Sequence, residues 1–261
     1  MPRLAANLSL LFAGLPLTDR VLAAADAGFA AVEMQFPYDQ DVDALAAALQ
    51  RTGLPLVLHN LPAGDWAGGE RGIACHPGRV AEFRAGVQRA IEVAQALGTP
   101  RLNALAGLLP HDVSPRDAQA TLVDNLRFAA DALAHHGLQL VVEPINTFDV
   151  PGFYLATSAH ALQVIEQVAH PNLRLQFDCY HLHRMEPPLL ATLQRALPHI
   201  GHVQIADHPG RHEPGSGEID FAAVFALLDA AGYRGWVGCE YLPAGDTAAG
   251  MAWRRRFCAS G

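Results

Sequence analysis

The stretch "GLQLVVEPIN", residues 137–146, joins two kinds of secondary structure. Gly137 ends an Ala- and Leu-rich segment with helical spacing, and glycine is common just past a helix. The run at 138–143 is short and mostly apolar, which is typical of a buried strand. The stretch therefore predicts a helix, a turn and a strand that carries a carboxylate, Glu143, at its carboxyl end.

The same alternation recurs along the chain. Strands are predicted at about residues 4–10, 30–34, 54–59, 101–106, 138–143, 172–178, 201–206 and 236–241. Helices are predicted at about residues 18–27, 41–52, 79–97, 115–136, 158–169, 186–197 and 221–231, with a short eighth at 246–256 and with Thr18 and Ser114 as N-caps. Eight such units predict an α/β fold, a (β/α)8 TIM barrel, in a single domain at 1–261. The alternative, a doubly wound sheet, usually has a Gly-rich phosphate loop after its first strand, and "LSLLFAGLPLT" is not such a loop.

Composition narrows the classes of function. Net charge is −8, which argues against a nucleic-acid partner. All 18 cationic side chains are arginines, so a lysine Schiff base, PLP chemistry and a nucleotide-binding P-loop are excluded. No apolar run approaches the roughly 20 residues of a membrane span. The four cysteines, Cys75, Cys179, Cys239 and Cys258, form no CxxC pair, and we expect a cytoplasmic protein with reduced thiols.

Polar side chains lie at or near the carboxyl ends of four successive predicted strands. They are Glu143, Asp178, Gln204 and Glu240, each out of phase with the large apolar residues of its strand. In a barrel, that phase faces the mouth, so three carboxylates and an amide would converge. Like charges at such range need a counter-ion, and oxygen ligands favour Mg²⁺ or Mn²⁺. We therefore expect a metal site made by these four residues.

Other polar residues are weaker candidates. His59 and His181 are as well explained by substrate contact as by structural hydrogen bonds. Arg71, in the long loop 60–79, and Arg211 are candidates to hold a substrate carboxylate, although either could be a surface arginine. His202 would lie deeper in the barrel, Glu33 could be an inward ion-pair partner, and Asp207 is expected to be a solvated loop residue.

Several motifs together resemble the hydroxypyruvate isomerase family of xylose-isomerase-like TIM barrels, which includes 2-oxo-tetronate isomerases. They are "HNLPAGDW", "GERGIACHPGR", "VEPIN", "DVPGF", "FDCYH", "GHVQIAD", "EPGSGEID" and "WVGCEY", and they span most of the chain. The resemblance implies that Glu143 and Glu240 are the catalytic acid/base pair and that Asp178 and Gln204 complete the metal shell. Sugar 3-epimerases of the same superfamily look similar but carry a histidine in place of Gln204.

The expected substrate is hydroxypyruvate or a close 2-oxo-3-hydroxy acid, converted through an enediol to a 2-hydroxy-3-oxo acid such as tartronate semialdehyde. The alternatives are a 2-oxo-tetronate isomerase, a sugar 3-epimerase, a nuclease resembling apurinic endonucleases and a non-catalytic sugar-binding barrel. Related barrels often associate, so a homo-oligomer is compatible with the resemblance, but no residue identifies an interface.

Overall fold

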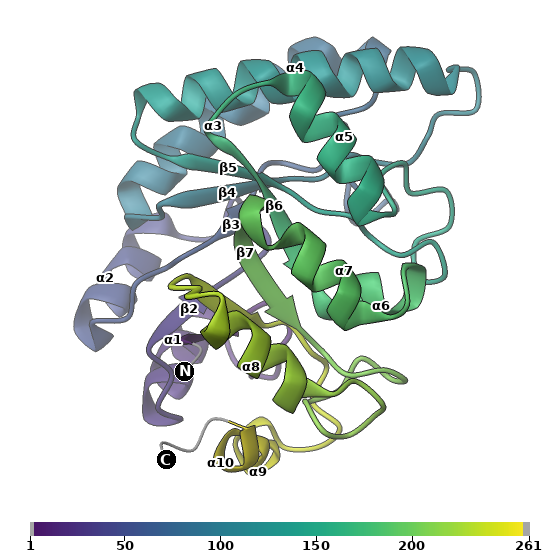
Figure 1. The fold of residues 1–261 in the computed structure, drawn as a ribbon. Coiled ribbons are helices and arrows are strands. Elements are labelled where there is room, and N and C mark those ends of the chain that lie inside the picture. The colour runs from purple at the N-terminus through teal and green to yellow at the C-terminus, as the bar shows by residue number, and fades with distance from the viewer. Residues whose placement is uncertain (1–2, 258–261) are drawn as a thin grey trace.

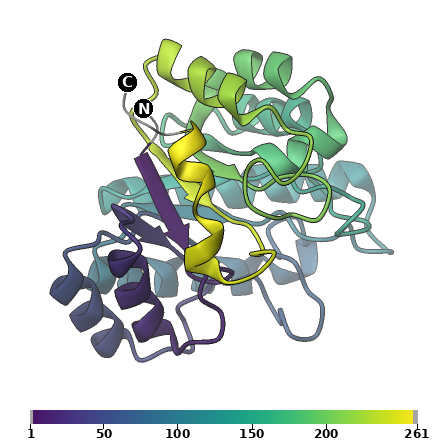
Figure 2. The same cartoon turned by 90° about the horizontal axis from the view of Figure 1, so that it is seen from below.

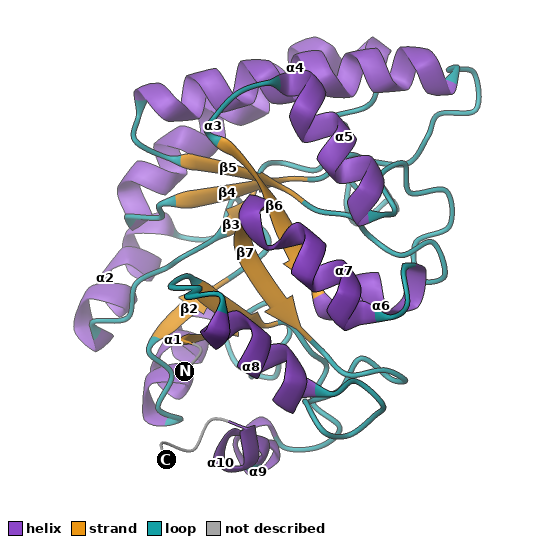
Figure 3. Cartoon of the chain, viewed as in Figure 1, coloured by secondary structure: helices purple, strands orange, loops and turns teal. Residues whose placement is uncertain are grey.

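Eight parallel strands form one sheet at the centre of the protein (Figures 1 and 3). The computed structural model describes residues 3–257. The strands are β1 (Arg3–Asn7), β2 (Ala31–Glu33), β3 (His59–Asn60), β4 (Arg101–Ala104), β5 (Gln139–Val142), β6 (Leu173–Asp178), β7 (Ile200–Ile205) and β8 (Trp236–Cys239). Their order is β2-β1-β8-β7-β6-β5-β4-β3.

The two ends of this sheet meet. The Val32 amide donates to the carbonyl of Pro55 at 3.0 Å, and the Val57 amide donates to the carbonyl of Val32 at 2.8 Å. The prediction of a TIM barrel is therefore confirmed. The prediction of a strand over 54–59 is wrong in its bounds, because β3 covers only His59–Asn60. Pro55 has no N–H to donate, and the segment pairs with β2 through a single bridge, Val32 to Leu56.

Helices surround the strands, as Figure 1 shows. They are α1 (Leu17–Asp26), α2 (Val42–Thr52), α3 (Val80–Leu97), α4 (Pro115–His135), α5 (Ser158–Val168), α6 (Cys179–Met185), α7 (Leu189–Ala196), α8 (Phe221–Ala230), α9 (Thr247–Gly250) and α10 (Trp253–Phe257), with 3-10 turns at Pro77–Arg79 and Leu197–His199. Ser114 caps α4 as predicted. Thr18 is not an N-cap, because α1 begins at Leu17 after Pro16.

Two helical predictions need correction. The sequence indicated one helix at 186–197, but α6 precedes it, because Asp178 accepts hydrogen bonds from the first amides of α6 and starts a helix directly at the strand end. The predicted helix at 246–256 is two short helices, α9 and α10. Figure 2 shows these C-terminal helices beside β1, and Arg254 donates to the carbonyls of Ala27 and Gly28.

The inside of the barrel is apolar at its amino end and polar towards its carboxyl end. Ala5, Ala31 and Val57 form a small buried cluster against Trp236. Above it, Glu33 and His202 are fully buried, with Glu33 Oε2 2.6 Å from His202 Nε2. Glu33 is thus an inward partner of His202, which the sequence had left open, and the prediction that His202 lies deep in the barrel is confirmed.

The main core fills the space between the sheet and the helices and is built from Leu, Val, Ala and Phe side chains. Cys75, Cys179 and Cys239 are buried, while Cys258 lies outside the described residues. Within residues 3–257, no helix is both long enough and apolar enough to cross a membrane.

Candidate active site

Four ionisable side chains converge at the carboxyl ends of β5, β6 and β8. Glu143 directly follows β5, Asp178 ends β6, Glu240 directly follows β8, and His181 lies in the first turn of α6. One side-chain atom from each lies within 4.8 Å of the others, and all four residues are buried. The structure therefore brings together the three carboxylates expected from the sequence, and adds His181.

Burial perturbs the acids strongly. It raises the pKa of Glu143 well above its usual value, and the charges of Glu240 and Asp178 raise it further. Burial raises the pKa of Asp178 to about 7, although Arg211 opposes the rise. Burial also raises the pKa of Glu240, again against Arg211. A bound cation would favour the ionised forms of these three acids, because it would offset the burial and the like charges that raise their pKa values.

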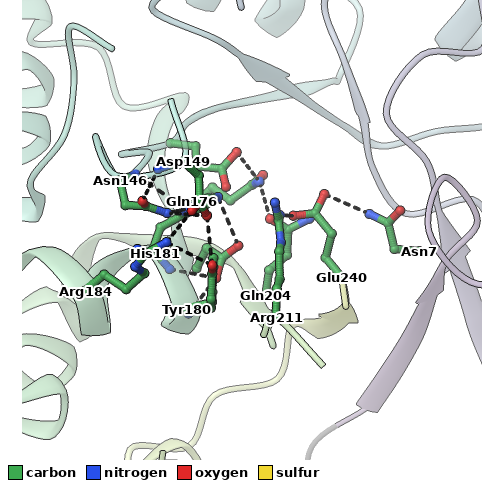
Figure 4. A network of polar contacts seen from close by, with 12 residues as sticks. Asn7, Asn146, Asp149, Gln176, Tyr180, His181, Arg184, Gln204, Arg211 and Glu240 are labelled. Carbon is green, nitrogen blue, oxygen red and sulfur yellow. Dashed lines mark hydrogen bonds and ion pairs between the residues drawn. The ribbon is translucent and has the colours of Figure 1, made fainter. Parts of the chain in front are cut away.

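Amide side chains orient the two glutamates, and Figure 4 shows one of these contacts, between Asn7 and Glu240. Asn103 Nδ2 and Gln176 Nε2 each donate to Glu143 Oε2 at 2.9 Å. Asn7 Nδ2 and Gln35 Nε2 each donate to Glu240 Oε1 at 3.1 Å. Each glutamate thus has one oxygen held by two neutral donors, which fixes the direction of the carboxylate.

Asp178 uses its two oxygens differently. Its Oδ1 accepts from the amides of Tyr180 at 2.7 Å and His181 at 3.4 Å, which anchors the start of α6. Its Oδ2 is buried and has no hydrogen-bond partner. A buried carboxylate oxygen without a donor is costly, and a divalent cation would satisfy it. The residues present therefore fit the metal that the sequence predicts.

His181 is held as a hydrogen-bond donor. Asn146 Nδ2 lies 2.6 Å from His181 Nδ1, and Asn146 is oriented because its Oδ1 accepts from the amides of Phe148 and Asp149. Burial lowers the pKa of His181 well below its usual value, so the ring is neutral. With Nδ1 accepting, the proton is on Nε2, which lies 3.7 Å from Asp178 Oδ2 and faces the site.

Gln204 lies beneath the carboxylates. Its Nε2 donates to Glu33 Oε1 at 2.7 Å, and its Oε1 accepts from Gln176 Nε2 at 2.6 Å. A carbonyl oxygen has two lone pairs, so one remains for a further partner. The network fixes the orientation of the amide and points its oxygen towards the same side as Glu143.

Arg211 reaches the acids, whereas Arg71 does not. Arg211 Nη2 donates to Glu240 Oε2 at 2.6 Å, and its guanidinium lies over the Tyr180 ring at 5.3 Å. Its Nε is buried and has no partner. Arg71 donates to the carbonyls of Glu70 and Trp66 within its own loop and stacks on the Trp66 ring at 4.4 Å.

His59 and Asp207 are also buried but are not part of the cluster of Glu143, Asp178, His181 and Glu240. His59 is fully buried, packs edge-to-face on Tyr38, and has its pKa lowered to about 3 by burial. Asp207 is fully buried, so the expectation of a solvated loop residue is wrong. Its carboxylate accepts four backbone amides of its own loop, which explains why the chain buries it.

Sequence reasoning missed the amides that hold the glutamates. Asn103 lies between Leu102 and Ala104, and Gln176 lies between Leu175 and Phe177. Both residues alternate with apolar neighbours along their strands, so their side chains point into the barrel. This alternation could have identified them from the sequence.

Comparison with known proteins identifies the family of the chain. Residues 21–257 match the family model described as xylose isomerase-like TIM barrel. The chain belongs to this family. A hydroxypyruvate isomerase of Escherichia coli (strain K12) is 49% identical over 97% of this chain and 98% of its own length. A 2-oxo-tetronate isomerase of Cupriavidus necator is 44% identical over 98% of this chain and 99% of its own. The resemblance seen in the motifs is confirmed.

Two solved structures have the same architecture as this chain. A structure described as AP endonuclease, family 2, from Brucella melitensis superposes with a TM-score of 0.95 at 43% identity, covering 98% of this chain and 99% of that one. An L-ribulose 3-epimerase superposes with a TM-score of 0.75 at 26% identity, covering 94% and 82%.

Proposed function

We propose that this chain is an isomerase that interconverts hydroxypyruvate and 2-hydroxy-3-oxopropanoate, or the corresponding pair of four-carbon acids. The observation that carries the proposal is the pair Glu143 and Glu240, which are buried at the carboxyl ends of β5 and β8, have side-chain oxygens within 4.8 Å of each other and have raised pKa values. The isomerase names of the two curated relatives support the reaction class. We further propose that it acts on the free acid in the cytoplasm, without a nucleic-acid or membrane partner.

The reaction moves hydrogen between adjacent carbons. One glutamate removes a proton from C3 of hydroxypyruvate while the C2 oxygen gains a proton, which forms an enediol. The C3 hydroxyl then loses its proton to solvent, which balances the proton that the C2 oxygen took from solvent, and the second glutamate delivers a proton to C2, which forms the aldehyde. The raised pKa values suit both roles, because a higher pKa makes an ionised glutamate a stronger base and lets a glutamate stay protonated to a higher pH.

We propose that Glu143, Asp178, Gln204 and Glu240 hold Mg²⁺ or Mn²⁺, with Asp178 Oδ2 as the oxygen that lacks any other partner. When bound, such an ion would act as a Lewis acid towards the substrate carbonyl. The amides of Asn103 and Gln176 keep Glu143 directed at the site in either case.

The substrate carboxylate is assigned to Arg211. Its unpartnered Nε is a buried donor, and its Nη2 already lies beside Glu240. The His181 Nε2–H provides a second donor for a substrate oxygen. Arg71 and His59 remain weaker substrate-binding proposals, because Arg71 is bound to its own loop and His59 is buried against Tyr38.

Substrate class is tested by proton NMR in D2O with Mg²⁺, in parallel with hydroxypyruvate, a 2-oxo-tetronate and a ketohexose. We expect deuterated product from at least one 2-oxo acid, and loss of turnover with EDTA. Exchange with the ketohexose alone would replace the proposal with a sugar 3-epimerase. Because the Brucella melitensis protein is described as an AP endonuclease, an abasic DNA duplex is the further arm, and its cleavage without any isomerisation would overturn the proposal.

A further inference from the structure

A second group of metal-ligating side chains lies outside the carboxylate site. His183 on α6, His208 in the loop after β7 and Glu218 before α8 form a cluster, which we call the histidine cluster. His183 Nε2 lies 3.1 Å from Glu218 Oε1, and His208 Nδ1 lies 2.9 Å from the same oxygen. The three residues border a surface pocket of about 430 Å³ together with Phe148, Arg184 and Pro187.

The distances from the two histidine nitrogens to Glu218 Oε1 are close to the distance between neighbouring ligand atoms around a small metal ion. Zn²⁺ binds imidazole nitrogen and carboxylate oxygen at about 2.0–2.2 Å in a tetrahedron, so neighbouring ligand atoms lie roughly 3.3 Å apart. Both nitrogen-to-oxygen separations fall within a few tenths of an ångström of that value. Two imidazoles and one carboxylate leave a fourth position, which would face the pocket.

Backbone contacts hold two of the ligands in place before any ion binds. The Glu218 amide donates to the carbonyl of His208 at 2.7 Å. The buried Asp207 carboxylate accepts the amides of His208, Gly215, Gly217 and Ile219. The loop 207–219 is therefore ordered around a buried acid, and His208 and Glu218 are presented side by side at its surface.

The third ligand comes from a different element. His183 lies on α6, which Asp178 anchors at its first turn, and its ring centroid lies 5.5 Å from that of His208. The hydrogen bonds from His183 and His208 hold the pKa of Glu218 below its usual value, so its carboxylate is ionised and able to ligate. Tyr180 separates the cluster from the acids, with its ring 6.2 Å from that of His208 and 5.3 Å from the Arg211 guanidinium.

We propose that His183, His208 and Glu218 form a second metal site, selective for a borderline-soft divalent ion such as Zn²⁺ over Mg²⁺. Two nitrogen ligands favour such an ion, whereas the all-oxygen carboxylate site favours Mg²⁺ or Mn²⁺. The bound ion would tie α6 to the loop 207–219, and these two segments carry His181 and Arg211. The site is independent of the proposed isomerisation.

The test is a Zn²⁺ titration of the full chain kept saturated with Mg²⁺, repeated with Co²⁺ as a spectroscopic probe. We expect one Zn²⁺ per chain, and visible Co²⁺ bands of the intensity typical of a tetrahedral site. H183Q and H208N should each weaken Zn²⁺ binding at least tenfold, because loss of even an outer-shell partner weakens metal sites by about 10–100-fold. The matched control is H135N, a surface histidine of α4 outside the cluster, which should bind Zn²⁺ as the wild type does.

Melting temperatures provide the second readout. Zn²⁺ should raise the melting temperature of the wild type and of H135N, and should leave that of H208N unchanged. Zn²⁺ affinity and Co²⁺ spectra that are the same in wild type, H183Q and H208N would overturn the proposal. None of these readouts uses turnover, so a failure of the isomerase proposal would leave them intact.

Discussion

Removal of the Asp207 carboxylate should loosen the loop that carries Arg211. The side chain is fully buried, and its Oδ1 accepts the amides of His208 at 2.9 Å and Ile219 at 3.0 Å, while its Oδ2 accepts those of Gly215 and Gly217 at 2.8 Å each. Each buried donor left without a partner costs about 1–3 kcal/mol, which sets a ceiling of roughly 4–12 kcal/mol for four. Opening of the loop to water limits the loss, so we expect D207A to lose about 3–5 kcal/mol.

For a chain of this size that loss corresponds to a fall in melting temperature of roughly 10 °C. D207N is the matched control: its single carbonyl oxygen can keep two of the four amides, so its loss should be about half. Urea unfolding measures the free energies, and amide hydrogen exchange reports whether residues 207–219 become exposed. The reasoning is refuted if D207A unfolds within about 1 kcal/mol of the wild type with those amides still protected.

Three further predictions concern the barrel interior. Burial raises the folded-state pKa of Asp178 from 3.8 to about 7, so its contribution to the stability of metal-free protein is full below about pH 4 and is lost as pH rises through 7. Mg²⁺ should therefore raise the melting temperature more at about pH 8 than at about pH 6. An equal rise at the two pH values would contradict this. G238A would force a Cβ against the carboxylate of Glu33, and urea unfolding should show a loss of about 1–3 kcal/mol rather than none. Q35A removes a hydrogen-bond donor that lowers the pKa of Glu240, so the acid limb of the pH profile of kcat/KM should move to higher pH. An unchanged acid limb would exclude Glu240 as the titrating group.

The strands and most helices could be predicted because hydrophobic pattern and glycine positions are local signals. Ser114 followed by Pro115 specified the start of α4, and Gly53 and Gly98 end α2 and α3 in the left-handed conformation. The helix α6 was missed because its cap is Asp178, and the sequence offered a different use for that carboxylate. One oxygen of Asp178 caps the helix and the other faces the site, and no sequence pattern distinguishes the two.

The convergence of the carboxylates was predictable because parallel strands place their carboxyl ends at one edge. The orientation of the polar side chains around the carboxylates could not be predicted. The proton position on His181 depends on Asn146, which lies 35 residues away, and the burial of Asp207 depends on amides up to 12 residues further along the chain. Such contacts are set by loop geometry, which carries no periodic signal.

The central claim is that Glu143 and Glu240 transfer the proton between the two carbons. Its most direct test compares wild type, E143Q and E240Q for turnover of hydroxypyruvate in D2O, with melting curves to show that each variant is folded. Glutamine keeps the shape of the side chain and removes the acid, so each variant should lose at least the ~10²–10⁴-fold contribution of a general acid or base, and deuterium uptake should fall with it. Wild-type turnover and deuterium uptake in either folded variant would contradict the account.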